Sequence, residues 1–197
     1  GPSCKPVVAD DKKCDGEGGR DNSVEGFFGI IGALLSTDAS SFYSKRANDG
    51  EWGLLIRVQD YNGEKDDDQV TMATYVVPSF DSTGMGAVPK WDGTDAWAVS
   101  QTSLVGTTVD EPRYVDTNAY VAGGQLVGSF KTSEIQLAGT KSNLIFQIKQ
   151  TFVVAPLVKE ADGWHIKRAV LAGRLSEDAI FLAISSYRSN LGEPLCT

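Results

Sequence analysis

The segment from Trp52 to Val77 constrains the fold more than any other part of the sequence. Two runs rich in β-forming residues, 52–59 and 69–77, are separated by the polar segment 60–68. Apolar and small side chains of the second run fall on two alternating sides, as they do in a strand. Between the runs, the pair Asn62-Gly63 tolerates positive φ and is the strongest short-range hairpin signal. The sequence therefore predicts an antiparallel hairpin with an acidic loop at its tip.

Further turn signals predict that most of the chain has the same architecture. Strands are expected near 96–101, at 114–121 and 125–130 on either side of Gly123-Gly124, at 143–154, and at 164–175 after Asp162-Gly163. Several Gly and Pro residues predict a long loop over 78–93. Strands joined by turns, without regular crossover helices, favour an antiparallel arrangement. We therefore expect a mainly β protein, an antiparallel β-sandwich or jelly-roll-like fold.

Short helices are expected near both termini. Residues 24–35 are strongly apolar with a glycine at every third position, which is typical of a helix face that packs closely. A second short helix is expected to begin at Ser36, Thr37 or Asp38 and to end at Asn48-Asp-Gly50. Near the other end, Ser176 is expected to cap a helix over 179–187, with acidic residues at its positive end.

The length and composition favour one globular domain. A chain of 197 residues can bury a sizeable core, and a hydrophobic content of 41% excludes a disordered chain. Residues 1–22 are polar and are expected to form a flexible tether, in which Gly1-Pro2 looks like the remnant of a cleaved tag. Residues 23–197 are expected to form a single β-sandwich domain.

The charge balance excludes some partners. The formal net charge of −8 argues against nucleic acid, because phosphate binding needs a concentrated basic surface. No apolar run approaches the roughly 20 residues that span a bilayer, so no transmembrane segment is expected. Neutral ligands and divalent cations remain open.

The three cysteines, Cys4, Cys14 and Cys196, lie at the two ends of the chain. A disulfide between the N-terminal segment and the C-terminus would hold down ends that otherwise fray. Three single pairings are open, and Cys14–Cys196 is the pair that we expect because it links the edges of the ordered region. A disulfide implies a periplasmic or extracellular compartment. The odd cysteine could instead be a lipid-attachment point near a mature N-terminus.

Several short motifs suggest a family. They are Cys14-Asp-Gly with Asp21-Asn22, Trp52-Gly-Leu-Leu-Ile-Arg-Val with Tyr61-Asn-Gly and Asp67-Asp-Gln-Val70, and Ala172-Gly-Arg-Leu175 before a predicted helix. In these motifs the chain resembles secreted or lipid-anchored surface proteins of large-genome Gram-negative bacteria. The resemblance implies an extracellular or cell-envelope location, and it brings no activity and no catalytic residues with it.

The acidic loop is a candidate calcium site. Its oxygen-bearing side chains are Asp60, Asn62, Glu64, Asp66 and Asp67, followed by Asp68, and Ca²⁺ prefers such ligands. The loop begins like an EF-hand but has Lys65 at the glycine position and Thr71 at the position of the bidentate glutamate. A second acidic cluster, 15–22, has Arg20 at the glycine position. Ca²⁺ is therefore the candidate cofactor, and solvated acidic turns are the alternative.

A glycan is the second candidate ligand. Trp91 and Trp97 lie in or beside the Pro- and Gly-rich loop, close to Asp92 and Asp95. A sugar ring stacks its C–H face on an aromatic platform while its hydroxyls find carboxylates. Large aromatic side chains are more often structural, so packing in the core is the alternative.

Signals for catalysis are weak. Glu64-Lys-Asp66 and Glu160-Ala-Asp162 have the spacing of paired carboxylates, but both fall in predicted turns. His165 is the single histidine, and no serine lies in a nucleophile-elbow motif. We therefore expect no catalytic residues and a non-enzymatic surface or binding module, with an extracellular glycan or surface protein as its partner. A glycan-active hydrolase and a self-assembling structural subunit are the alternatives.

Overall fold

The computed structural model describes residues 38–80, 87–138, 143–166 and 168–186. Contacts within the chain divide it into two compact units, Gly1–Lys45 and Arg46–Thr197, and each is described by itself. All three cysteines, the apolar segment 24–35 and the predicted tether boundary at residue 22 lie outside the described residues. The disulfide, the first helix and the tether therefore stay predictions.

The first described helix, α2 (Ala39–Asn48), begins where the sequence predicts a cap. The carboxylate of Asp38 accepts a hydrogen bond from the backbone N–H of Ser41 at 2.7 Å, the geometry of an N-cap. This bond, with a further one from the Ser41 side chain, holds the pKa of Asp38 below its ordinary value. At the other end, Gly50 has a φ of 78° and its N–H bonds to the carbonyl of Ala47 at 2.9 Å. Of the three candidate caps, Asp38 is the one used.

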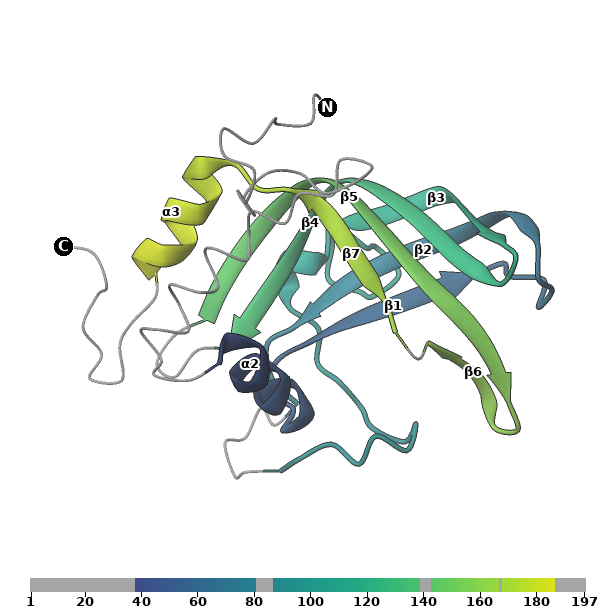
Figure 1. Cartoon of the computed structure of the whole chain (residues 1–197), viewed down its shortest axis with the longest axis horizontal. Coiled ribbons are helices and arrows are strands. Elements are labelled where there is room, and N and C mark those ends of the chain that lie inside the picture. The colour runs from purple at the N-terminus through teal and green to yellow at the C-terminus, as the bar shows by residue number, and fades with distance from the viewer. Residues whose placement is uncertain (1–37, 81–86, 139–142, 167, 187–197) are drawn as a thin grey trace, which may run out of the picture. The chain divides into compact units, whose positions relative to one another are not determined.

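Strands make up about half of the described residues. They are β1 (Gly53–Gln59), β2 (Asp67–Val77), β3 (Tyr114–Ala122), β4 (Gln125–Ala138), β5 (Asn143–Glu160), β6 (Gly163–Ile166) and β7 (Val170–Arg174). Every pair is antiparallel, in the order β1-β2-β3-β4-β5-β6, with β7 also paired to β5. The sheet curls into a half-barrel (Figure 1). The mainly β, antiparallel prediction is confirmed, whereas a sandwich or jelly roll is not, because the described strands form one connected sheet.

The predicted hairpins form. The ladder between β1 and β2 runs from Gly53 opposite Val77 to Gln59 opposite Thr71 and leaves the acidic loop at its tip. Gly123 and Gly124 join β3 to β4 with φ values of 57° and 79°, and a two-residue turn of this kind needs positive φ at both positions. The predicted strand 164–175 is instead two strands, β6 and β7.

The predicted strand at 96–101 is wrong. The chain there is irregular and leads into a short 3₁₀ helix, η1 (Gln101–Ser103). Because β3 starts opposite Thr74, the last residues of β2 have no strand partner on that side. The turn takes their hydrogen bonds: Ser100 N–H donates to the Val76 carbonyl, and Val76 N–H donates to the Ser103 hydroxyl, both at 2.8 Å. The turn therefore takes the backbone hydrogen bonds at the end of β2 that a neighbouring strand would otherwise have taken.

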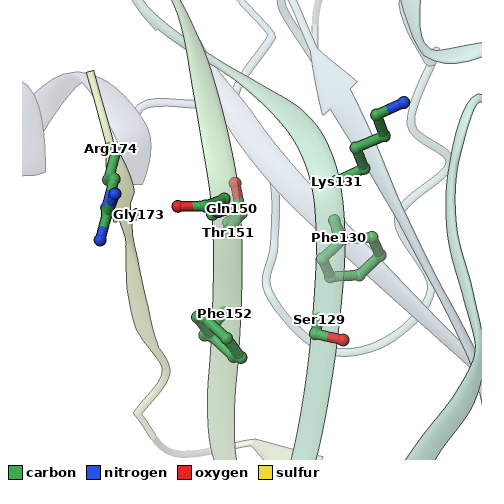
Figure 2. A pocket seen from close by; sticks show the side chains of 8 residues that line it. All are labelled: Ser129, Phe130, Lys131, Gln150, Thr151, Phe152, Gly173 and Arg174. Atoms are coloured by element: carbon green, nitrogen blue, oxygen red, sulfur yellow. The ribbon is translucent and has the colours of Figure 1, made fainter. Parts of the chain in front are cut away.

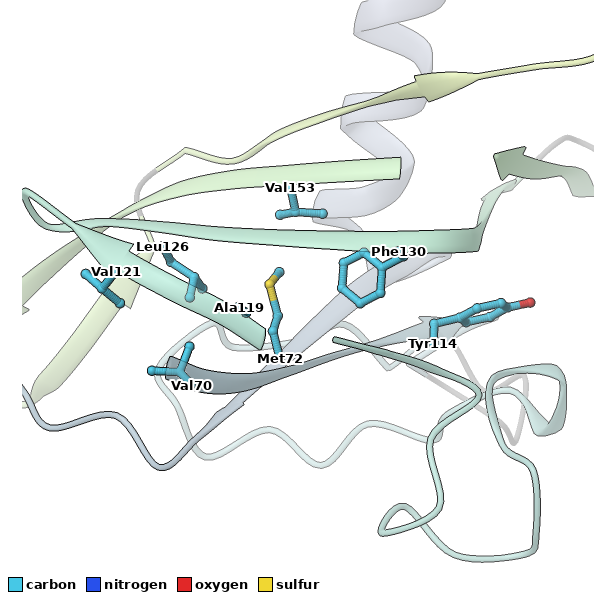
Figure 3. Close-up of a cluster of buried hydrophobic side chains, with 8 residues drawn as sticks. All are labelled: Val70, Met72, Tyr114, Ala119, Val121, Leu126, Phe130 and Val153. Carbon is cyan, nitrogen blue, oxygen red and sulfur yellow. The ribbon is translucent and has the colours of Figure 1, made fainter. Parts of the chain in front are cut away.

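A cluster of buried side chains between β2, β3, β4 and β5 forms the main core of the sheet (Figure 3). Its members are Val70, Met72, Tyr114, Ala119, Val121, Leu126, Phe130 and Val153. Met72 is fully buried, and its sulfur would clash with a Cβ added at Gly128. Burial of each large side chain contributes roughly 1.5–3 kcal/mol, so this cluster is a principal source of stability for the sheet.

The second described helix, α3 (Glu177–Ser186), packs against β5. The hydroxyl of Ser176 accepts a hydrogen bond from Ala179 N–H at 3.3 Å, and Glu177 and Asp178 follow in the first turn. The predicted cap is confirmed, as is the prediction of short helices near both ends. Neither of the helices in the described part of the chain is long and apolar enough to cross a bilayer.

Candidate functional site

Three aromatic rings from the segment around residues 80–97 stack on one another, and we call this set the aromatic platform: Phe80, Trp91 and Trp97. The ring centroids of Phe80 and Trp97 are 4.9 Å apart, and those of Trp97 and Trp91 are 5.2 Å apart. The rings are tilted against each other, an arrangement that adds about 0.5–1.5 kcal/mol per pair beyond the area that it buries. Trp91 ends the stack and is 60% exposed.

The backbone under Trp91 is held in a conformation that a tryptophan rarely adopts. Its φ is 58°, in the left-handed region. The carboxylate of Asp95 accepts the backbone N–H groups of Lys90 at 3.0 Å and of Trp91 at 2.7 Å. The indole N–H donates to the carbonyl of Asn48 at 3.0 Å. These three bonds fix both the backbone and the ring, so the exposed indole is presented in one orientation.

Asp92 is an exposed carboxylate beside the platform. Its Oδ1 accepts the Thr94 hydroxyl at 2.6 Å and the Thr94 N–H at 3.0 Å. These bonds lower the pKa of Asp92, and the bond from the Thr94 hydroxyl has the larger effect. The carboxylate is therefore ionised at neutral pH. The structure therefore brings together all four residues of the predicted glycan site, with Trp91 and Asp92 on the surface and Asp95 bonded to the backbone.

Sequence reasoning missed the residues that support the platform. Gly50 adopts a φ of 78°, and a Cβ at this position would lie 2.6 Å from Pro89 Cδ and 2.8 Å from Phe80 Cβ. The Gly50 carbonyl accepts the N–H of Phe80 at 2.6 Å. In the sequence, Asn48-Asp-Gly50 indicates only the end of a helix, and nothing local indicates that residues 30 or more positions away pack against the glycine.

The oxygens of the acidic loop are used largely by the loop itself. Asp67 accepts the N–H of Asn62 at 2.8 Å and of Gln69 at 3.3 Å, one on each carboxylate oxygen. The side-chain oxygen of Asn62 accepts Glu64 N–H at 2.7 Å. Among the described residues, no three carboxylates of this loop converge within 4.8 Å of one another. Calcium binding in the loop remains a prediction, and the loop as described has its own internal hydrogen bonds.

Two hairpin tips and strand β5 are tied together at this end of the sheet. The Lys65 carbonyl and the Asp66 carboxylate accept the N–H groups of Gly124 at 2.7 Å and Gly123 at 2.8 Å. The Gly124 carbonyl in turn accepts Leu157 N–H at 2.9 Å. The acidic loop, the β3–β4 turn and the far end of β5 therefore form one hydrogen-bonded group, which we call the tied tips.

A different group of side chains could hold a metal ion. The ligand atoms of Glu160, Asp162 and His165, at the β5–β6 turn, all lie within 4.8 Å of one another. His165 Nε2 is 2.8 Å from Asp162 Oδ1 and 3.8 Å from Glu160 Oε2. In the sequence, Glu160-Ala-Asp162 and His165 carry separate signals. The hairpin register, with Glu160 opposite Gly163 and Val158 opposite His165, puts Glu160 and His165 on the same face.

A carboxylate is also buried inside the sheet. Glu134 is 6% exposed and accepts the Thr102 hydroxyl at 2.8 Å, with the Tyr114 hydroxyl at 3.5 Å. Burial, and secondly the charge of Glu134, raises the pKa of Tyr114 to about 12. The group joins η1 to β3 and β4, so its role in the described structure is to hold the covering turn to the sheet.

Comparison of the chain with protein-family models, with curated proteins and with solved structures found no match.

Proposed function

We propose that the protein is a non-enzymatic binding module of the cell surface or extracellular space, and that its ligand is a glycan bound on the aromatic platform. The observation that carries the proposal is the fixed, exposed indole of Trp91. A side chain that is already held in place loses little conformational entropy when a ligand binds. The C–H face of a sugar ring would stack on the indole, and its hydroxyls would donate to the ionised Asp92.

A glycan array tests this proposal with the full chain. Wild-type protein is expected to bind a defined set of glycans, and Trp91→Ala is expected to weaken that binding about tenfold or more, because the stacked face is lost. Trp164→Ala is the matched control, since Trp164 is another exposed tryptophan, on β6, and is 41% exposed. Absence of any bound glycan, or equal loss in the two variants, would contradict the proposal.

Binding of a divalent cation is a second candidate, supported by the convergence of Glu160, Asp162 and His165. A ligand that binds only the folded state at 100 times its dissociation constant adds about 2.7 kcal/mol of stability. We expect a thermal melt with excess Ca²⁺ or Zn²⁺ to shift upward by several degrees relative to EDTA. Loss of the shift in His165→Ala would assign it to this turn, whereas loss in Glu64→Gln would assign it to the acidic loop. A melt that neither ion changes at millimolar concentration would exclude both sites.

Each of the two alternative functions depends on a structural feature other than the aromatic platform. A hydrolase needs two carboxylates that converge in a cleft, and the pair Glu160 and Asp162 is exposed at a hairpin turn. A structural subunit would assemble through sheet edges, and β1 is an outer strand in the described order. Light scattering of the purified protein separates self-assembly from the binding module, because only the former predicts growth of the particle with concentration.

The extracellular or envelope location, the resemblance to secreted surface proteins and the lipid anchor belong to the same proposal. The expected Cys14–Cys196 disulfide supports the oxidising location, whereas the lipid anchor would use the odd cysteine. Thiol titration of the native protein under denaturing, non-reducing conditions is expected to find one free thiol. Three free thiols would remove the argument for an oxidising compartment.

A further inference from the structure

A pocket of about 490 Å³ opens over β4, β5 and β7 (Figure 2). None of its lining residues belongs to the segment that forms the aromatic platform. We call it the bulge pocket. The lining residues that matter here are Ser129, Lys131, Gln150, Phe152, Gly173 and Arg174. Ser129 and Phe152 are directly opposite each other in the β4–β5 ladder, so their side chains share a face of the sheet.

An irregularity of β5 creates the hollow. Lys149 is opposite Arg174, but Phe152 is opposite Ala172, so β5 has one residue more than β7 over this stretch. The extra residue is accommodated at Gln150, whose φ of 49° lies in the left-handed region. Gly173 permits the close approach, because a Cβ there would meet the Ile148 side chain and lie 3.1 Å from the Lys149 carbonyl oxygen. The surrounding packing therefore holds a strained non-glycine residue at the pocket.

The two charged side chains that line the bulge pocket are both cationic. Lys131 comes from β4 and Arg174 from β7, with β5 between them, as Figure 2 shows. The described residues that line the pocket include no carboxylate, although the chain has 26 acidic residues and 18 basic ones. Neither Lys131 nor Arg174 forms an ion pair with another residue in the described part of the chain. Two unpaired cations beside one pocket favour an anionic ligand.

The pocket also has an apolar wall and neutral polar groups. Phe152 is 52% exposed, which leaves a large ring surface for a ligand. The side-chain amide of Gln150 provides hydrogen-bond donors without adding charge, whereas the Ser129 hydroxyl already donates to the Asp116 carboxylate at 3.3 Å. A ligand that suits this lining carries a negative group next to a ring or short apolar chain.

We propose that the bulge pocket binds a small organic oxyanion, with its phosphate or carboxylate between Lys131 and Arg174 and its apolar part on Phe152. Arg174 is the principal anchor, because a guanidinium can donate two parallel hydrogen bonds to either oxyanion. This site is independent of the glycan site, since it shares no residue with the aromatic platform.

The test uses the ¹⁵N-labelled full chain titrated with phenyl phosphate, benzoate and phenol at constant ionic strength. The two anions are expected to shift the amide signals of residues 129–131, 150–152 and 173–174, and the tighter of the two identifies the preferred oxyanion. Phenol has the same ring without the charge and is expected to leave these signals unchanged. Phenol binding as tightly as the anions, or no localised shift with any of them, would overturn the proposal.

Charge-removing variants then locate the anion. Arg174→Gln and Lys131→Gln are each expected to weaken binding of the preferred anion about fivefold or more, since hydrogen bonds to charged groups are the stronger ones. Lys65→Gln removes the same charge from the acidic loop and is expected to leave affinity unchanged. An equal loss in Lys65→Gln would show only a net-charge effect and would refute the site. The spectrum of each variant reports whether that variant is folded. If a variant does not fold, the shift pattern of the wild-type protein alone tests the proposed site.

Discussion

The carboxylate of Asp116 on β3 accepts two hydrogen bonds from Ser129 on β4, from its N–H at 2.7 Å and from its hydroxyl at 3.3 Å. The ladder between these strands begins at the Gly123-Gly124 turn and ends with Tyr120 opposite Val127. The contact therefore joins β3 and β4 at a point where their backbones have already separated.

Loss of this carboxylate is expected to destabilise the sheet. Asp116→Ala removes the acceptor of the partly buried hydrogen bond from Ser129 N–H, which costs about 1–3 kcal/mol. Urea unfolding followed by circular dichroism measures the change. Ser129→Ala, which removes only the longer bond from the hydroxyl, is expected to cost less than Asp116→Ala, and the reverse order would show that Asp116 does not join the strands.

The platform provides a matched pair of glycine substitutions. Gly50→Ala puts a Cβ against Pro89 and Phe80 and also forces alanine into a φ of 78°, so we expect a loss of about 2–4 kcal/mol. Gly93→Ala has a similar φ of 82° but nothing within 4 Å of the added carbon, so we expect only the backbone cost of about 1 kcal/mol. Thermal melts of the two variants give the comparison. Equal losses would mean that the contact beneath the platform contributes nothing.

Stability is expected to fall in alkali partly through Tyr114. Its pKa is about 12 in the folded state against an ordinary 10.0, because burial favours the neutral phenol. A raised pKa contributes stability that is complete below pH 10 and is lost as the pH rises toward 12. Tyr114→Phe cannot ionise at this position, so between pH 9 and pH 11 its stability should fall less, by up to about 1 kcal/mol after allowance for solvent screening. Urea unfolding at pH 9 and pH 11 measures the difference. Parallel curves for the two proteins would contradict it.

The strain at Gln150 can be relieved by substitution. Glycine adopts a φ of 49° without a steric penalty, so Gln150→Gly relieves the backbone strain. The greater conformational entropy of glycine in the unfolded chain offsets part of this gain, and we expect a net stabilisation of about 0.5–1 kcal/mol. The measurement is the midpoint of urea unfolding. Gln147→Gly, on the same strand but outside the irregularity, is the control and is expected to be destabilising. Destabilisation by both variants to the same extent would show that the left-handed backbone at Gln150 carries no strain.

Features that depend on neighbouring residues were predictable from the sequence. The hairpin with Asn62-Gly63 at its tip, the Gly123-Gly124 turn and the caps Asp38 and Ser176 all use side chains within a few positions of the backbone groups that they serve. The grouping of Trp91, Asp92, Asp95 and Trp97 was predictable for the same reason, because one short loop contains all four.

Features that depend on strand register were not predictable. Residues 96–101 alternate like a strand, but they cover the end of β2 because β3 begins at Tyr114, and no local pattern specifies that offset. The placement of Lys131 and Arg174 beside one pocket, and the approach of Glu160 and His165, likewise follow from strand pairing, so these residues carry no joint signal in the sequence.

The tied tips have a consequence for how the protein opens. The acidic loop, the β3–β4 turn and the end of β5 share hydrogen bonds through Lys65, Gly124 and Leu157, so none of the three can detach without breaking a bond to another. Their amides should exchange with solvent deuterium at similar rates, as one cooperative unit. A ligand that stabilised the acidic loop alone would then slow exchange at Gly124 and Leu157 as well, and its binding would be detectable at residues that it never touches.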